Sequence, residues 1–196
     1  MTDSNIPTYQ LEGKQLKIYT YPAPILKKIA EPVTEFNDEL KALIKDMLFT
    51  MYNAPGIGLA APQVGISKRI FVMDIDYDRE EVSEADGNKK YEYSGFNPRV
   101  IINPEFSNKT GETLFEEGCL SVPGVYEQVK RAETVTVKYQ DVHGEFHQIE
   151  AEGILSVCLQ HENDHLEGIV FLERLSQLKQ NFLKKKFLKN KKKQSL

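Results

Sequence analysis

Apolar residues recur at helical spacing in the first part of the chain. After Asn37 and Asp38, either of which can cap a helix, apolar side chains repeat every three to four positions until the breaker-rich segment 53–58. This pattern predicts a helix with one face on the core. A shorter helix is predicted for Ile25–Ala30, behind Pro24. The inward positions of the longer helix are Leu40, Leu43, Ile44, Met47, Leu48 and Met51.

Two uninterrupted apolar runs predict buried strands. They cover Arg69–Ile75 and Val100–Asn103. The segment between them, Asp76–Pro98, is charged and poor in apolar residues. We predict a long surface loop there and assign it no catalytic role.

The middle of the chain, Glu105–Ala151, has the period of two that is typical of strands. Apolar and polar residues alternate most clearly in Thr134–Tyr139. Asp141–Gly144 has the composition of a tight turn, which leads into a further strand over Glu145–Glu150. We therefore expect this region to be all-β.

The helical period returns at Gly153. It continues to Leu166, and Gly168 is placed to end the helix. A final helix is predicted from Glu173 toward Asn190, with inward positions Leu175, Leu178, Phe182, Leu183 and Phe187. Because strands fill the middle and helices the two ends, without internal repeats, the predicted fold class is α+β.

Length and composition narrow the class of protein. With 196 residues, 40% of them hydrophobic, the chain fits one domain over residues 1–196 with a short appendage. The segment Met1–Gln10 is polar, and no apolar stretch reaches the roughly 18 to 20 residues that span a bilayer. Two cysteines, Cys119 and Cys158, fit a reducing compartment. We expect a cytoplasmic protein without a membrane or DNA partner.

Positive charge is concentrated near the C-terminus. Residues 179–193 hold eight lysines and no acid, which leaves 17 basic and 29 acidic residues elsewhere and a net charge of −12. A basic helical tail over about residues 174–196 therefore follows an acidic body. Such a run of charge is usually solvated, but it also fits contacts with RNA phosphates.

The helix predicted from Gly153 contains the pattern H-E-x-x-H. His161 and His165 are four residues apart, so both imidazoles lie on one face and can bind one metal ion. Glu162 is rotated by about 100° from His161. It is badly placed as a ligand but well placed as a general base for a water on the metal.

A catalytic metal usually has three protein ligands and one open position. Beyond Gly168 the only acid is Glu173, and its spacing does not exclude it as the third ligand. Cys119, between Gly118 and a turn-forming segment, is the better candidate, although a lone cysteine is more often a small buried apolar residue.

Three segments together resemble the signature motifs of the peptide deformylase family, in the same order and at similar separations. They are Gly56-Ile57-Gly58-Leu59-Ala60-Ala61-Pro62-Gln63, Glu117-Gly118-Cys119-Leu120-Ser121 and Gln160-His161-Glu162-Asn163-Asp164-His165-Leu166. Each segment alone is a weak to moderate signal, whereas the set is highly specific. The resemblance spans most of the chain and implies antiparallel strands packed around a central metal-binding helix, with a helix at the C-terminus.

The resemblance also implies a reaction. Cys119, His161 and His165 would bind one divalent ion, with Fe²⁺ expected in the cell and Zn²⁺, Ni²⁺ or Co²⁺ in purified forms. A metal-bound hydroxide would attack the formyl carbon of an N-formylmethionyl nascent peptide and release formate. Glu162 would act as general base and acid, and Gln63 and the Leu120 N–H would stabilise the oxyanion.

The expected substrate pocket follows partly from helix geometry. Ile154, Val157 and Cys158 precede His161 by seven, four and three residues, so they line the helix face beside the first ligand. By resemblance the other pocket residues are Gly56, Ile57, Gly58, Phe115 and Glu117. Arg131 matches a family arginine that would pair with Glu117 as a structural brace.

Two other hypotheses remain open from the sequence. The first is a different metallopeptidase that uses the same H-E-x-x-H helix and does not need Gln63. The second is a non-catalytic ribosome-binding module with a structural metal. Some bacterial deformylases dock on the ribosome through a basic C-terminal helix, so ribosome contact by the lysine tail is a further hypothesis.

Overall fold

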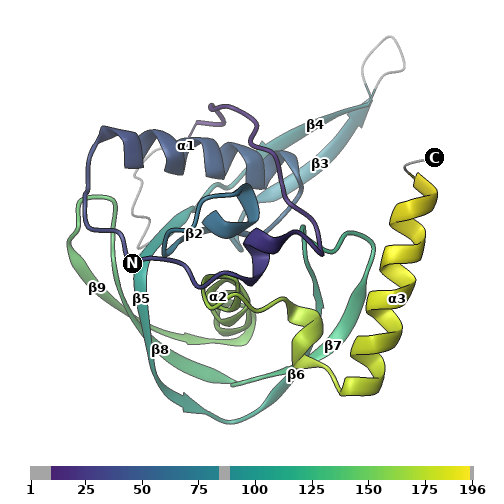
Figure 1. The fold of residues 1–196 in the computed structure, drawn as a ribbon. Coiled ribbons are helices and arrows are strands. Elements are labelled where there is room, and N and C mark those ends of the chain that lie inside the picture. The colour runs from purple at the N-terminus through teal and green to yellow at the C-terminus, as the bar shows by residue number, and fades with distance from the viewer. Residues whose placement is uncertain (1–9, 84–88, 195–196) are drawn as a thin grey trace.

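A five-stranded antiparallel sheet with a helix against each face forms the core of the protein (Figure 1). The computed structural model describes residues 10–83 and 89–194, so the polar segment predicted for Met1–Gln10 lies outside the described residues except at Gln10. The strands follow the order β1 (Gly58–Ala60), β2 (Ile70–Met73), β5 (Arg99–Thr110), β8 (Thr134–Gln140) and β9 (Phe146–Glu152).

Both faces of the central strands are covered, which explains their continuous apolar runs. Ile70 and Val72 of β2 pack with helix α1 (Asp38–Asn53). Phe71 and Met73 point to the opposite face and pack with helix α2 (Gly153–Leu166). The helix predicted after Asn37 and the two predicted buried strands are therefore confirmed.

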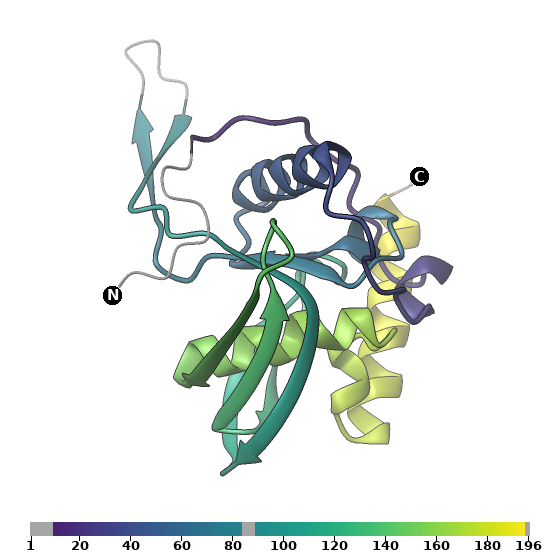
Figure 2. The same cartoon turned by 90° about the vertical axis from the view of Figure 1, so that its left-hand side faces the viewer.

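Helix α2 runs through the middle of the molecule. Figure 2 shows β5, β8 and β9 curving around it, while α1 lies on the other side of the sheet. Gly153 has φ +57° where β9 ends and the helix begins, a conformation that glycine adopts without steric cost. Both predicted ends of this helix, Gly153 and Leu166, are confirmed.

A separate antiparallel ribbon carries the predicted cysteine. Its strands are β6 (Thr113–Gly118) and β7 (Tyr126–Arg131). Cys119 is the first residue after β6, so the end of that strand fixes where its thiol lies. The ribbon packs through Val129 on the C-terminal elements η3 (Phe171–Arg174) and α3 (Gln177–Gln194).

The prediction of a surface loop over Asp76–Pro98 is wrong. β3 (Asp78–Ser83) and β4 (Lys89–Ser94) form an antiparallel hairpin that projects from the body, as Figure 1 shows, and residues 84–88 lie outside the described residues. The alternation that predicts a strand requires one buried face. Among the described residues, the hairpin packs on the body at its base, through side chains such as Tyr77 and Tyr93, and its sequence is otherwise polar.

The prediction for the last helix is partly wrong. Glu173 belongs to the short 3₁₀ helix η3, and α3 starts only at Gln177. Phe187 is buried as expected, but Leu178 and Phe182 are 83% and 65% exposed because the helix contacts the body along a narrow stripe. The helix predicted for Ile25–Ala30 is also shorter, a 3₁₀ turn over Pro24–Lys27. None of the described helices has the length and apolar character needed to cross a membrane.

Candidate metal centre and active site

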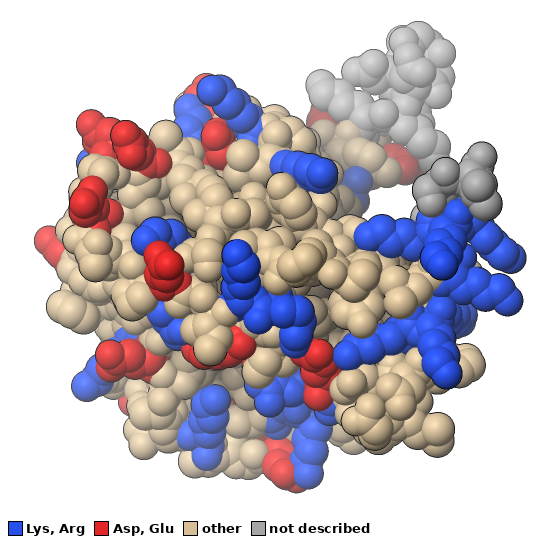
Figure 3. Space-filling view, in the orientation of Figure 1, with Lys and Arg blue, Asp and Glu red and all other residues tan. Residues whose placement is uncertain are grey.

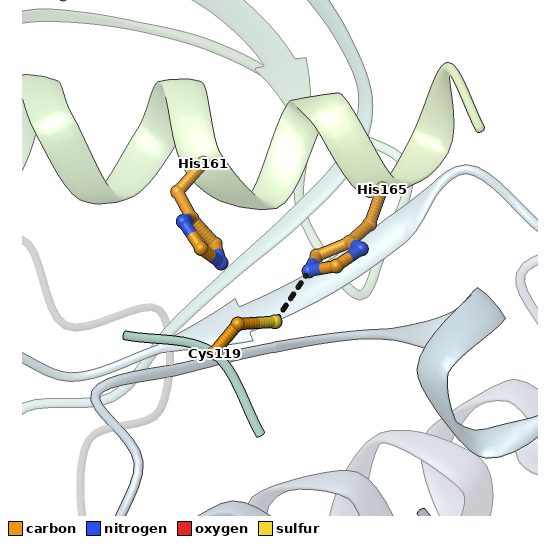
Figure 4. A group of neighbouring side chains, drawn as sticks. All are labelled: Cys119, His161 and His165. Atoms are coloured by element: carbon orange, nitrogen blue, oxygen red, sulfur yellow. Dashed lines mark hydrogen bonds between the residues drawn. The ribbon is translucent and has the colours of Figure 1, made fainter. Parts of the chain in front are cut away.

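Three predicted ligands converge between two elements that are distant in sequence. Figure 4 shows Cys119, from the end of β6, facing His161 and His165 on α2. One ligand atom from each side chain lies within 4.8 Å of the other two. The Sγ of Cys119 is 3.3 Å from Nε2 of His165.

This geometry fits a single metal ion. With metal–sulfur and metal–nitrogen bonds of about 2.3 and 2.0 Å, tetrahedral donor atoms lie about 3.3 to 3.6 Å apart. Nδ1 of His161 lies 2.8 Å from Oε2 of Glu117, and this carboxylate favours a proton on Nδ1 and leaves Nε2 as the donor to a metal. Glu173, the other candidate third ligand, pairs instead with Lys27 at 2.5 Å and Lys184 at 3.2 Å.

The imidazoles favour the thiolate form of Cys119. Burial alone raises the pKa of this thiol, but the charges and hydrogen bonds of His165 and His161 outweigh that effect and lower the pKa to about 5. Only the thiolate is a strong metal ligand, so the site is electrostatically prepared for a cation.

Glu162 has the properties of a proton carrier. Its side chain is buried, and one carboxylate oxygen, Oε2, has no hydrogen-bond partner among the described residues. Burial raises the pKa of Glu162 to about 7, which lets the carboxylate both accept and return a proton near neutral pH. The neighbouring backbone of Gly58 has room for this carboxylate because glycine has no Cβ.

Gln63 is held with its amide nitrogen toward the thiolate. Its Oε1 accepts a hydrogen bond from the Ala60 N–H at 2.8 Å, which fixes the orientation of the amide. Its Nε2 then donates to Ser121 Oγ at 3.1 Å and lies 3.6 Å from Cys119 Sγ. The backbone N–H of Leu120 donates to no group in the described chain. Two donors therefore lie next to the predicted ligands.

A buried ion-pair network orients the first histidine. Arg131 donates to Glu117 through Nε at 2.7 Å and Nη2 at 2.8 Å, so the predicted pair is present. Burial raises the pKa of Glu117, but hydrogen bonds from Arg131 and His161 more than offset this and lower it overall. Arg131 also binds Asp164, which in turn accepts from Arg174. The sequence does not single out Asp164 and Arg174, and only the position of Asp164 inside the H-E-x-x-H motif hints at a role.

A pocket of about 440 Å³ opens beside these groups. The structure brings together there every pocket residue predicted from the sequence, whereas His165 is buried and does not line the pocket. Burial raises the pKa of the Cys158 thiol, so this cysteine remains a neutral wall residue. The predicted residues that line the pocket are Gly56, Ile57, Gly58, Gln63, Phe115, Glu117, Cys119, Leu120, Ile154, Val157, Cys158, His161 and Glu162.

Comparison with known proteins identifies the family. The family model described as polypeptide deformylase matches residues 15–181. The chain belongs to this family. A peptide deformylase of Chromobacterium violaceum is 49% identical to it over 92% of this chain and 98% of its own length.

Solved deformylase structures have the same fold. The Legionella pneumophila enzyme is 47% identical, with a TM-score of 0.77 over 92% of this chain and 98% of that chain. A Met-Ala-Ser-bound class I type b deformylase from Acinetobacter baumannii is 36% identical, with a TM-score of 0.71 over 84% of this chain and 100% of that chain. The predicted α+β fold, with a C-terminal helix, is confirmed.

Family membership decides between the hypotheses drawn from the sequence. The chain is a metal-dependent hydrolase with deformylase activity on formylmethionyl peptides, and it acts in the N-terminal processing of new proteins. The alternatives, another H-E-x-x-H metallopeptidase and a non-catalytic metal module, are not supported.

Proposed function

We propose that the deformylase reaction is divided among the residues of this site as the sequence predicts. Cys119, His161 and His165 hold the metal ion, and Glu162 moves the protons. The observation that carries the proposal is the convergence of three ligand atoms beside a buried carboxylate oxygen that has no partner in the described chain.

The resident ion in the cell is Fe²⁺ under this proposal, and Zn²⁺, Ni²⁺ or Co²⁺ can take its place in purified protein. One thiolate and two imidazoles form a mixed ligand set that accepts each of these ions. When bound, such an ion lowers the pKa of a coordinated water toward about 7 and polarises the substrate carbonyl.

Glu162 accepts a proton from the attacking water and later donates it to the leaving amine. Its pKa of about 7 suits both steps, because the group is then readily deprotonated and readily reprotonated at neutral pH. The oxyanion that forms at the formyl carbon accepts hydrogen bonds from Gln63 Nε2 and the Leu120 N–H. These donors are fixed before the reaction, so little reorganisation is needed in the transition state.

The pocket binds the methionine side chain and the start of the peptide backbone. Ile57, Phe115, Ile154, Val157 and Cys158 form apolar walls that fit an unbranched side chain. The segment Gly56, Ile57 and Gly58 pairs with the backbone of an extended peptide, and Glu117 also lines the pocket. The Met-Ala-Ser ligand of the Acinetobacter baumannii relative supports this assignment.

The lysines of α3 provide a second contact, with the ribosome. Figure 3 shows basic side chains gathered along the side of the molecule where α3 lies. We propose that this cytoplasmic enzyme uses them to bind phosphates of ribosomal RNA close to emerging nascent chains.

The decisive experiment compares two substrates on protein purified without oxygen. Metal content is measured first, and formate and acetate release are then followed with formyl-Met-Ala-Ser and acetyl-Met-Ala-Ser. The expected result is one ion per chain and rapid release of formate only. Equal turnover of the acetyl peptide, or full activity after the ion has been removed by a chelator, would contradict the proposal.

A further inference from the structure

An aromatic cluster joins the base of the β3–β4 hairpin to the body of the protein. The ring of Tyr52 lies 4.8 Å from the rings of both Tyr77 and Phe96, in edge-to-face contacts. Tyr93 stacks at 6.4 Å on Tyr77 and on Phe96. These contacts place each tyrosine ring independently of its hydroxyl group.

The hydroxyl of Tyr77 reaches the segment that lines the substrate pocket. It donates a hydrogen bond to the carbonyl oxygen of Gly56 at 3.2 Å. The N–H of Gly56 donates to Met51 at 3.0 Å, and the carbonyl of Ile57 accepts from Asp74 at 2.9 Å. Burial raises the pKa of Tyr77, so its hydroxyl stays protonated and remains a donor.

Of the four backbone N–H and C=O groups of Gly56 and Ile57, these bonds account for three within the described residues. The N–H of Ile57 donates to no group among the residues that the structure describes. This N–H and the carbonyl of Gly56 belong to the same peptide group, and in a planar trans peptide they point in opposite directions. The hydrogen bond from Tyr77 to that carbonyl therefore sets the direction of the Ile57 N–H. Gly56 and Ile57 line the pocket and Tyr77 does not, so the free N–H lies on the pocket side.

We propose that Tyr77 is a positioning residue that orients the Ile57 N–H toward a carbonyl of the bound peptide backbone. The inference rests on the proposed function, in which residues 56–58 pair with the substrate backbone. It gives the hairpin, to whose segment Asp76–Pro98 the sequence analysis assigns no catalytic role, a part in substrate binding through its base.

The test compares Tyr77→Phe with the matched control Tyr93→Phe. Both changes remove one hydroxyl from the same cluster and keep the ring, but the Tyr93 hydroxyl donates to Tyr52 at 3.3 Å and not to the pocket segment. Two substrates are used, formyl-Met-Ala-Ser and N-formyl-3-(methylthio)propylamine. The second has the formyl amide and the methionine side chain but lacks every backbone carbonyl that could accept from Ile57.

We expect Tyr77→Phe to raise KM for the tripeptide about three- to tenfold, with kcat changed less than twofold, because one neutral hydrogen bond loses its alignment. The truncated substrate should be unaffected, as should both substrates with Tyr93→Phe. The thermal midpoints of Tyr77→Phe and Tyr93→Phe should agree within about 4 °C. Each variant loses one hydrogen bond, and such a loss shifts the midpoint by no more than about that amount.

Three results overturn the inference. Unchanged kinetics with Tyr77→Phe would show that the Tyr77 hydroxyl does not contribute to substrate binding. An equal loss of activity with both substrates, or with both variants, would show a general effect of the aromatic cluster on the fold. Wild-type protein that releases no formate from the tripeptide overturns the proposed function itself, and this inference with it, so the two failures are distinguishable.

Discussion

Glu162 and Gly58 show how closely the backbone fits the proposed base. A Cβ added at Gly58 would lie against Oε1 of Glu162 and only 2.7 Å from its Cδ. Real Cβ atoms do not approach other heavy atoms this closely, so one of the two groups must move. The carboxylate is the flexible end of a side chain, and it moves more easily than the backbone of β1.

Replacing Gly58 by Ala should therefore damage catalysis more than folding. We expect kcat to fall at least about tenfold because a misplaced general base loses part of a contribution of about 10²- to 10⁴-fold. Metal content should not change. Formate release is measured for Gly58→Ala in the wild-type protein and in the Glu162→Gln variant. If Gly58→Ala lowered the rate by the same factor in both, Gly58 would not act through Glu162.

Replacing Glu162 by Gln should separate catalysis from metal binding. The amide keeps the shape of the side chain but cannot accept the proton, so we predict a fall in kcat of about 10²- to 10⁴-fold. Metal analysis of the same sample should still give one ion per chain. Retention of more than a tenth of the wild-type rate would exclude Glu162 as the base.

The sequence predicts the residues that chemistry requires more readily than those that hold them in place. The i, i+4 histidines define one helix face, and the three motifs point to Cys119 and Gln63. The contacts of Ser121 with Gln63 and of Arg174 with Asp164 depend on how separate elements pack. No spacing rule connects such residues, so only the structure identifies them.

At the scale of elements, burial decides which strands are predictable. β2 is covered on both faces and β8 is largely buried, and each leaves a clear apolar pattern in the sequence. β3 and β4 carry polar side chains, and their contacts include Arg79 over the Tyr91 ring and Tyr91 with Glu81. Pairing of backbone groups has no signature in side-chain hydrophobicity, so this hairpin could not be predicted from it.

Ion pairs as well as apolar packing hold the short helix η3 against the rest of the protein. Glu173 accepts from Lys27, Lys184 and the Val170 N–H. Burial raises the pKa of Glu173, but these hydrogen bonds, with that of Lys27 the largest, outweigh it and lower the pKa overall. A carboxylate with a depressed pKa stabilises the folded state above its unfolded pKa of about 4.3, and this stabilisation is lost as the pH falls through the folded pKa.

We therefore predict a pH-dependent effect of Glu173→Gln. At pH 7 the variant should melt about 2 to 4 °C below wild type, which corresponds to about 1 kcal/mol for a chain of this size. The difference should shrink to zero as the pH falls below about 4. Thermal unfolding at several pH values measures it. Glu12→Gln is the control, because Glu12 pairs with Lys45 on the surface, and an equal shift there would contradict a specific role for Glu173.

At the scale of the whole molecule, charge is segregated. The overall net charge of −4 combines an acidic body with the lysines of α3, which are gathered on one side (Figure 3). Phe187 of the same helix is buried, and its ring contacts the ring of Tyr21 edge to face. Deleting the helix would therefore remove packing together with charge, and substitutions give a cleaner test of ribosome binding.

We predict that replacing the exposed Lys185, Lys186, Lys189 and Lys193 by Gln weakens ribosome binding while leaving deformylation of a free tripeptide unchanged. Each lost phosphate contact lowers the dependence of binding on salt, so the slope of log affinity against log salt should become shallower. Co-sedimentation with ribosomes at increasing salt measures both effects. Equal sedimentation of the variant and wild type at low salt would contradict the proposed contact.

The separation of the metal ligands along the chain has a consequence for unfolding. Cys119 and His165 are 46 positions apart, the first directly after strand β6 and the second on helix α2. An ion bound to both would act as a cross-link that closes a long loop, much as a disulfide does. Each tenfold rise in free ion above the dissociation constant would then add about 1.4 kcal/mol to the free energy of unfolding. Starvation for the ion would thus shorten the lifetime of the enzyme as well as silence it.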